Sequence, residues 1–265
     1  MTHGIAGLKE QFLPTFAEAF QAAGYSVLLY DHRNWGASEG NPRNETDPIQ
    51  QARDYSDAFD FAASLPEVDD TKIVYWGSSM SGGAVIHAAA LDHRIAAVIS
   101  QVPFVSGENL AVGLAPRAES LYAARRQVKA GNPPPLIKLF ADDPTIATSG
   151  DHNAMVQDPS LVAFLEALKA GNIPWSPFVT PQTLLNLAAF EPLAFVHRIA
   201  PTPLLMVVVG NDDSSPTVSQ LKAFATAYEP KTLVLLRNTG HFDPYHGTGY
   251  EDNIKAQLKF LGETL

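Results

Sequence analysis

Three residues whose side chains could together perform nucleophilic catalysis are spread along the chain: Ser79, Asp212 and His241. Each follows an apolar run of strand length, so each is expected at the end of a strand. A serine hydroxyl is a poor nucleophile at neutral pH until an imidazole accepts its proton, and the imidazole works best when a carboxylate holds its tautomer. We therefore predict that Ser79 is a nucleophile, that His241 is its general base, and that Asp212 orients His241.

Two of these assignments have close rivals in the sequence. Asp213 is adjacent to Asp212, and an Asx turn is an alternative reading of both aspartates. His246 follows His241 by five residues and is expected in a loop that faces solvent or substrate, whereas His32 lacks a comparable loop context. No group of His, Asp and Glu residues has the spacing of metal ligands, so we predict neither a metal nor a cofactor.

The residues around Ser79 predict a sharp turn from a strand into a helix. A β-rich run over residues 72–76 stops at Gly77, and a helix-compatible run covers residues 84–91. In a nucleophile elbow the two arms of the turn nearly touch, so the residues two before and two after the serine must be small. Gly77 and Ser81 meet that requirement, although an ordinary Gly/Ser-rich turn is the alternative explanation.

Composition limits the classes of protein and partner. The 265 residues are 46% hydrophobic and 17% charged, which fits one large globular α/β domain with an insertion. A net charge of −10 disfavours nucleic acid and anionic membranes as partners, and a small or neutral substrate fits it better. The chain has no cysteine, no apolar leader over residues 1–11 and no apolar run of membrane-spanning length, so we expect a cytoplasmic location.

The order of apolar runs predicts how the chain is organised. Strand-like runs at 25–30, 72–76, 95–100, 203–209 and 232–236 alternate with helix-like runs at 13–23, 47–65, 84–91, 218–228 and 250–261. Such alternation is typical of a mostly parallel sheet with helices on both faces. From about residue 104 to 198 it gives way to Pro-punctuated helical runs at 117–130, 160–170 and 181–189. We predict an α/β core of residues 1–103 and 199–265 and a helical cap of residues 104–198.

Several motifs carry a resemblance to a known family. They are His-Gly-x-x-Gly-x-Lys-Glu at 3–10, Asp-His-Arg-Asn-x-Gly-Ala-Ser at 31–38, Gly-Ser-Ser-x-Ser-Gly-Gly at 77–83, Ser-Gln-Val-Pro at 100–103 and Gly-His-Phe-Asp-x-Tyr at 240–245. With the chain order serine, acid, histidine, they resemble the α/β-hydrolase superfamily over nearly the whole chain. The most similar subgroup is the fungal polyketide transferase and thiohydrolase type, which has dienelactone-hydrolase-like bacterial relatives.

The resemblance implies an α/β-hydrolase fold and a serine hydrolase or acyltransferase. The substrate would be an acyl ester or thioester of fungal secondary (polyketide) metabolism, free or bound to a carrier protein, and no cofactor is implied. It also implies that the backbone amides of Ile5 and Met80 form the oxyanion hole. The alternatives are a carboxylesterase or dienelactone-type hydrolase, and a catalytically inactive homologue that binds a ligand.

The chain departs from the family pattern at three points. Asn34 replaces one glycine of the Asp-x-Arg-Gly-x-Gly-x-Ser loop that the segment 31–38 resembles. Ser81 stands where the elbow usually has glycine. In the fold that the chain resembles, the His-Gly pair follows a strand in the middle of the sheet, and here only Met1 and Thr2 precede it. We therefore expect an N-terminally shortened form in which the first strands of the fold are missing.

Overall fold

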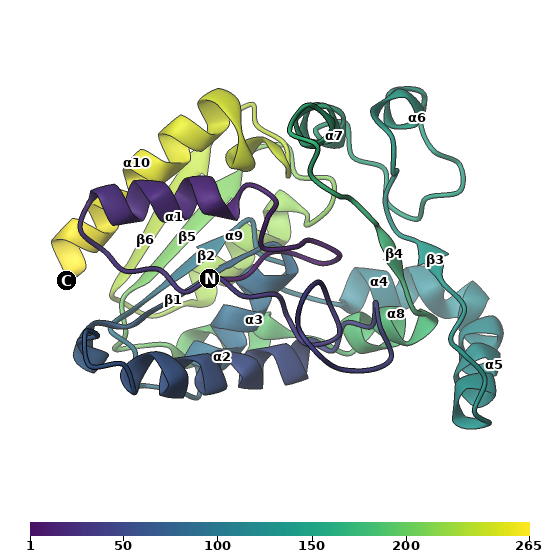
Figure 1. The fold of residues 1–265 in the computed structure, drawn as a ribbon, viewed down its shortest axis with the longest axis horizontal. Helices are drawn as coiled ribbons and strands as arrows, with labels where there is room; N and C mark the ends of the chain where they lie inside the picture. The colour runs from purple at the N-terminus through teal and green to yellow at the C-terminus, as the bar shows by residue number, and fades with distance from the viewer.

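A parallel sheet of four strands, in the order β1-β2-β5-β6, lies at the centre of the computed structural model, which describes residues 1–265 (Figure 1). The strands are β1 (Val74–Ser78), β2 (Ala97–Gln101), β5 (Leu204–Val209) and β6 (Lys231–Leu236). Every residue of β2 and β5 is buried. β5 is apolar throughout, as expected for a central parallel strand, whereas β2 ends in Ser100 and Gln101, whose buried side chains are hydrogen-bonded. All four strands run the same way, so their carboxyl ends share one edge.

Helices cover both faces of this sheet. They are α1 (Leu13–Ala22), α2 (Pro48–Ala63), α3 (Met80–Ala89), α9 (Thr217–Thr226) and α10 (Gly247–Thr264). Helices α1 and α10 lie on one face, and α2 and α3 on the other (Figure 1). Successive side chains of β5 point to opposite faces of the sheet, so Leu205 belongs to one apolar cluster and Met206 to the other. None of the helices combines the length and apolar character needed to cross a membrane.

Local sequence explains where α2 begins. The Asp47 carboxylate accepts hydrogen bonds from the amides of Ile49 and Gln50, both at 3.1 Å. Pro48 occupies the first helical turn, where its missing N–H costs nothing. The predicted start of this helix is therefore confirmed.

The chain also contains five short 3₁₀ helices, at Asp70–Lys72, Ala115–Arg117, Pro192–Ala194, Val196–Arg198 and Asp243–Tyr245.

Between β2 and β5 the chain forms a largely helical insertion. Its elements are α4 (Glu108–Leu114), α5 (Ala118–Lys129), β3 (Ile137–Lys138), α6 (Pro144–Ser149), α7 (Leu161–Ala170), β4 (Phe178–Val179) and α8 (Pro181–Ala188). The three predicted helical runs correspond to α5, α7 and α8, whereas α4, α6 and the antiparallel β3–β4 ribbon were not predicted. Phe140 and Phe164 share one apolar cluster with Trp76 of β1, so the insertion packs directly on the sheet domain. The division at residues 104 and 198 stays a prediction.

The prediction of a buried parallel strand over residues 25–30 is wrong. The segment forms no strand, and its residues are exposed or only half-buried. The Tyr25 amide donates to the Phe20 carbonyl of α1 at 3.0 Å. Beyond that, the backbone of the segment bonds to Met1, whose ammonium donates to the Leu28 carbonyl at 2.7 Å and whose carbonyl accepts from the Tyr30 amide at 3.5 Å. A ladder needs a neighbouring backbone along the whole segment. On the other side, Thr2 makes a single parallel bridge to Gly77 of β1.

Candidate active site

Ser79 stands alone between β1 and α3, in a backbone conformation that side-chain-bearing residues rarely adopt, with φ 59° and ψ −121°. Three backbone hydrogen bonds hold it there. Its amide donates to the Gln101 carbonyl at 2.8 Å, and its carbonyl accepts from the amides of Phe104 at 2.9 Å and Gly83 at 3.2 Å. The strained serine is therefore fixed by the end of β2 and the first turn of α3.

The two arms of this turn touch, as the elbow pattern predicts. A Cβ atom on Gly77 would lie 2.2 Å from the Ser81 carbonyl oxygen, which no side chain tolerates. The helix starts at Met80 rather than at the predicted residue 84, and Gly83 lets its first turn pack tightly on the chain that leaves β2. A Cβ on Gly83 would lie 2.1 Å from the Phe104 carbonyl oxygen.

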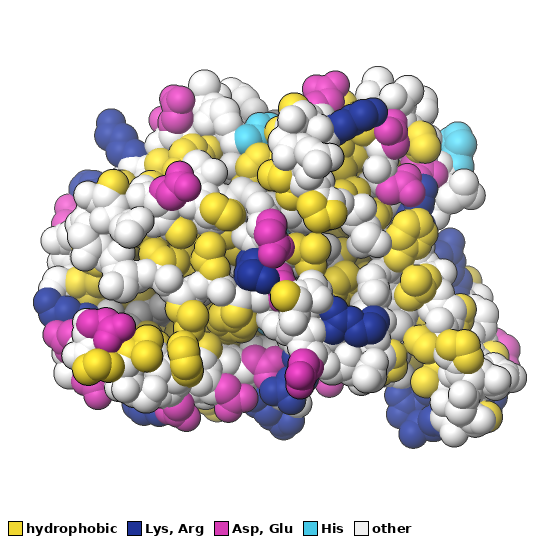
Figure 2. Space-filling view, in the orientation of Figure 1, with side chains coloured by type: hydrophobic (Ala, Val, Ile, Leu, Met, Phe, Trp, Pro, Cys, Tyr) yellow, Lys and Arg dark blue, Asp and Glu magenta, His cyan; other side chains and the backbone are white.

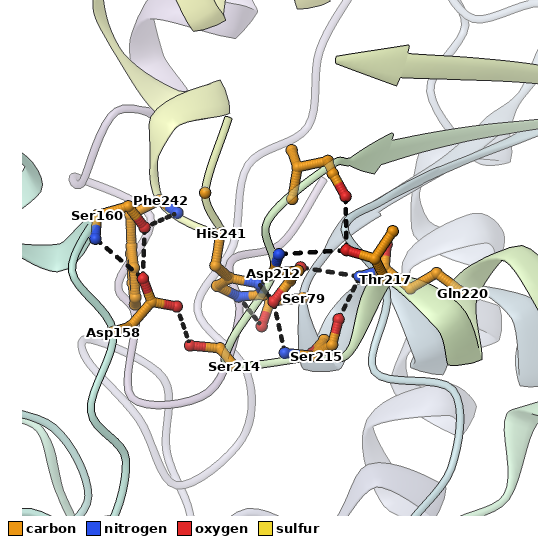
Figure 3. Close-up of polar contacts among 12 residues, drawn as sticks. Ser79, Asp158, Ser160, Asp212, Ser214, Ser215, Thr217, Gln220, His241 and Phe242 are labelled. Atoms are coloured by element: carbon orange, nitrogen blue, oxygen red, sulfur yellow. Dashed lines mark hydrogen bonds and ion pairs between the residues drawn. The ribbon is translucent and has the colours of Figure 1, made fainter. Parts of the chain in front are cut away.

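The structure joins Ser79, His241 and Asp212 by hydrogen bonds (Figure 3). His241 Nε2 lies 2.9 Å from Ser79 Oγ, and His241 Nδ1 lies 2.9 Å and 3.0 Å from the two Asp212 carboxylate oxygens. Since a carboxylate only accepts, Nδ1 carries the proton and Nε2 is free to accept the serine O–H. All three residues are less than a tenth exposed. This is the tautomer that a general base for Ser79 needs.

The electrostatics of His241 favour its protonated form. Burial alone would lower the pKa of this imidazole, but the adjacent Asp212 carboxylate, with a smaller contribution from Asp158, raises the pKa above its usual value of 6.5. An imidazolium that forms when Ser79 loses its proton is therefore stabilised where it appears.

Asp212, and not Asp213, contacts the imidazole. Besides His241, the Asp212 carboxylate accepts from the Ser215 amide at 2.6 Å and from Gln220 Nε2 at 2.8 Å. Asp213 is exposed to solvent. His246 is half-buried beside Phe12 and makes no hydrogen bond to Ser79 or Asp212. No group of three or more metal-ligating side chains is arranged to hold an ion.

The loop that contains Ile5 passes directly beside Ser79. A Cβ atom on Gly4 would lie 2.7 Å from the Ser79 Cβ, so only glycine lets the loop come this close. Neither the Ile5 amide nor the Met80 amide donates a hydrogen bond within the chain. The two predicted oxyanion donors are thus unpaired next to the serine, and their role in stabilising an oxyanion stays a prediction.

A buried network that the sequence did not reveal anchors this loop. Ser81 Oγ donates to the His3 carbonyl and lies 2.6 Å from His32 Nε2. The hydroxyl has one proton, so His32 must be the donor in the second bond, which makes it a neutral imidazole protonated on Nε2. Burial lowers the pKa of both His3 and His32 to about 3. The serine in place of the usual elbow glycine was the one sequence signal for this contact.

Comparisons with known proteins decide the family. Residues 1–251 match the sequence profile of the alpha/beta hydrolase family. The chain belongs to the α/β hydrolase family. Across its whole length it is similar to the thiohydrolase aneE of Aspergillus aculeatus, with 32% identity over 85% of that protein. It is also similar to the polyketide transferase ATR5 of Stachybotrys chlorohalonatus, with 35% identity over 88% of that protein.

A solved structure supports the same relationship for this α/β hydrolase. The crystal structure of the α/β hydrolase GrgF from Penicillium sp. sh18 superposes with a TM-score of 0.86 at 31% identity. The match covers 100% of this chain and 88% of that chain. The predicted fold class and the resemblance to the fungal thiohydrolase and polyketide transferase type are confirmed.

Proposed function

We propose that this α/β hydrolase is a serine hydrolase or acyltransferase that cleaves or transfers an acyl group from an ester or thioester. The observation that carries the proposal is the buried hydrogen-bond chain from Ser79 Oγ through His241 to Asp212, with 2.9 Å between Nε2 and Oγ. The unpaired amides of Ile5 and Met80 support it, since acyl transfer needs donors for a developing oxyanion.

In the first half-reaction Ser79 Oγ attacks the acyl carbonyl carbon while His241 Nε2 accepts the serine proton. The carbonyl oxygen becomes an oxyanion that the Ile5 and Met80 amides stabilise. When the tetrahedral intermediate collapses, the bond to the leaving thiol or alcohol breaks, and His241 returns the proton to that group. Asp212 keeps Nδ1 protonated throughout, so Nε2 remains the atom that exchanges the proton with Ser79.

In the second half-reaction water or an alcohol attacks the acyl-Ser79 ester. His241 takes the proton of the incoming O–H and then gives it to Ser79 Oγ as the ester bond breaks. Water yields a carboxylic acid, which is hydrolysis, and an alcohol yields a new ester, which is transfer. The fungal relatives are named thiohydrolase and polyketide transferase, which supports a thioester of secondary metabolism as the acyl donor.

We extend the proposal to an acyl donor on a carrier protein because of the charge on α5. Residues 117–129 expose Arg117, Arg125, Arg126 and Lys129 against the single acidic Glu119, whereas the whole chain has a net charge of −10. In Figure 2, Lys and Arg side chains lie along the margin of the lower-right lobe, which contains α5. A basic surface on an acidic protein favours approach of a carrier with an acidic face.

The first test is covalent labelling of the serine. The purified chain is treated with a fluorophosphonate probe, and its intact mass is compared with that of Ser79→Ala. One adduct on the unchanged chain and none on the variant is the expected result. A folded chain that acquires no adduct, or a variant that is labelled equally, contradicts the proposal.

The second test separates the acyl donors. We expect a higher kcat/KM for acyl N-acetylcysteamine thioesters than for p-nitrophenyl esters of the same chain length, and the reverse ranking indicates a carboxylesterase. Charge reversal at Arg125 and Lys129 should lower kcat/KM about tenfold for a carrier-bound acyl group at low salt and leave the small thioester unaffected. An equal loss on both substrates contradicts the docking role.

A further inference from the structure

The short segment 158–160, which precedes α7 in the insertion, contacts both loops that carry the acid and the base (Figure 3). Ser214 Oγ donates to Asp158 Oδ2 at 2.6 Å, and the Phe242 amide donates to Ser160 Oγ at 3.0 Å. Ser160 in turn donates to Asp158 Oδ1 from its hydroxyl at 2.6 Å and from its amide at 3.0 Å. Ser214 lies two residues after Asp212 in the loop of residues 210–216, which we call the acid loop. Phe242 directly follows His241 in the loop of residues 237–242, which we call the histidine loop.

This contact is buried and closely packed. The Asp158 residue is 7% exposed, and both of its carboxylate oxygens accept hydrogen bonds. A Cβ atom on Gly240 would lie 2.6 Å from the Ser160 Cβ, so the histidine loop is pressed against the segment. Phe164 of α7 packs on Phe242 with ring centroids 5.0 Å apart. The insertion therefore packs closely against the loop that carries His241.

Four ionisable groups lie on the loop of His241 or on the segments next to it. Asp212 is hydrogen-bonded to the imidazole, and Asp158 acts on it electrostatically from the insertion without touching it. Asp243 directly follows the histidine loop and accepts a hydrogen bond from the Gly240 amide at 2.7 Å. His3 lies in the loop that carries the Ile5 amide and acts on His241 electrostatically. Asp158 adds to the effect of Asp212 in raising the pKa of His241, whereas burial keeps His3 neutral above its pKa of about 3.

We propose that Asp158 is a positioning residue through which the insertion fixes the acid loop and the histidine loop relative to Ser79. The inference rests on the proposed function, because it assigns Asp158 a part in the Ser79 reaction. It differs from the roles of Ser79, His241 and Asp212, since Asp158 acts through Ser214 and Ser160 and touches none of the reacting atoms.

The experiment compares three variants with the unchanged chain. Asp158→Asn removes the charge at nearly constant size, Ser214→Ala removes the bond to the acid loop and keeps the charge, and Asp213→Asn removes an exposed charge of the same loop as a control. The readouts are kcat and KM on p-nitrophenyl butyrate and the rate of fluorophosphonate labelling of Ser79, each from pH 5 to 9.

We expect Asp158→Asn to lower kcat and the labelling rate about 10- to 100-fold with little change in KM, because the base is displaced from the serine. The acidic limb of the pH–rate profile of Asp158→Asn should move to lower pH, since the pKa of His241 falls when a neighbouring carboxylate is removed. Ser214→Ala should lower kcat less and leave that limb in place, and Asp213→Asn should match the unchanged chain.

Two results overturn the inference: Asp158→Asn that behaves like Asp213→Asn in both rate and pH profile, or a change confined to KM. If Asp158→Asn fails to fold by circular dichroism, Ser214→Ala and Ser160→Ala decide, and unchanged kcat in both overturns it. If the unchanged chain is not labelled at all, the proposed function is contradicted, and the role of Asp158 is tested by a measurement that needs no activity. The His241 imidazole is then titrated by ¹⁵N NMR, and an identical midpoint with and without Asp158→Asn overturns the inference.

Discussion

Two clusters of buried histidine meet at Ser79, and they differ in charge. The charged cluster consists of His241 and Asp212, and the pKa of its imidazole is raised. The neutral cluster consists of His3, His32 and Ser81, and the pKa of both of its imidazoles is lowered to about 3. All three histidines are at most 5% exposed, so burial alone does not separate them. The difference is the carboxylate, which is hydrogen-bonded to His241 and to neither of the others.

In the proposed reaction the two clusters have different tasks. The charged cluster can accept and return a proton near neutral pH, as a general base must. The neutral cluster keeps its protonation state over the same range, so the bonds from Ser81 to the His3 carbonyl and to His32 do not change with pH. The loop that carries the Ile5 amide is thereby held in one place while, in the proposed reaction, His241 exchanges a proton with Ser79.

Removing the Asp212 carboxylate should have the largest effect on activity. In Asp212→Asn the amide no longer holds His241 with its proton on Nδ1, so we expect kcat to fall by about 10⁴-fold with KM nearly unchanged. The measurement is steady-state turnover of a p-nitrophenyl ester. Asp213→Asn serves as the matched control, because Asp213 is exposed and one residue away. Equal losses in the two variants would show that the acid is wrongly assigned.

Breaking the neutral cluster should have a smaller effect. Ser81→Ala removes the bonds to the His3 carbonyl and His32, which frees the loop that carries the Ile5 amide. Loss of one oxyanion donor costs about 10²- to 10³-fold, so partial displacement should lower kcat by up to about 10²-fold. His32→Gln keeps an N–H donor near the Nε2 position and should retain most of the activity. A His32→Gln variant as poor as Ser81→Ala would argue against the proposed anchoring.

The sequence predicted the parts of this site that depend on local chemistry. Small residues around Ser79 are required by the turn itself, and continuous apolar runs identify β2 and β5, so the elbow and the central strands could be located. Ser79, Asp212 and His241 each follow a strand, and parallel strands bring their carboxyl ends to one edge, so the meeting of these residues could be predicted.

The parts that depend on distant neighbours were not predictable from one sequence. Asp158 lies 56 residues from Ser214, and nothing in its local sequence indicates a contact with the acid loop. His32 and Ser81 are 49 residues apart. Residues 25–30 have strand-like composition, yet strand formation depends on a partner backbone that no local pattern supplies. Asp212 and Asp213 differ only in the direction that the loop gives each side chain.

The pH dependence of activity should depend on His241 and not on His3 or His32. Only neutral His241 can accept the serine proton, and its raised pKa places the acidic limb of kcat/KM above pH 6.5. We expect a single proton in this limb, since His3 and His32 stay neutral until about pH 3. His32→Gln should leave the limb where it is within about 0.2 pH units. A second protonation between pH 5 and 7 that disappears in His32→Gln contradicts the neutral assignment.

The same two clusters should also affect stability. His32 has a pKa of about 3 in the folded chain and about 6.5 when unfolded, so the unfolded state binds more protons between these values. The free energy of unfolding should therefore fall as pH drops from 6.5 toward 3, by an amount on the order of a few kcal/mol for such a buried group. His241 acts in the opposite sense, because its raised pKa adds stability below pH 6.5 that is lost as pH rises through its folded value. Urea unfolding at pH 7.5 and pH 5 measures the difference in the free energy of unfolding between the two pH values. His32→Gln should reduce this difference. If the variant loses as much stability at pH 5 as the unchanged chain, His32 is not held neutral by the fold.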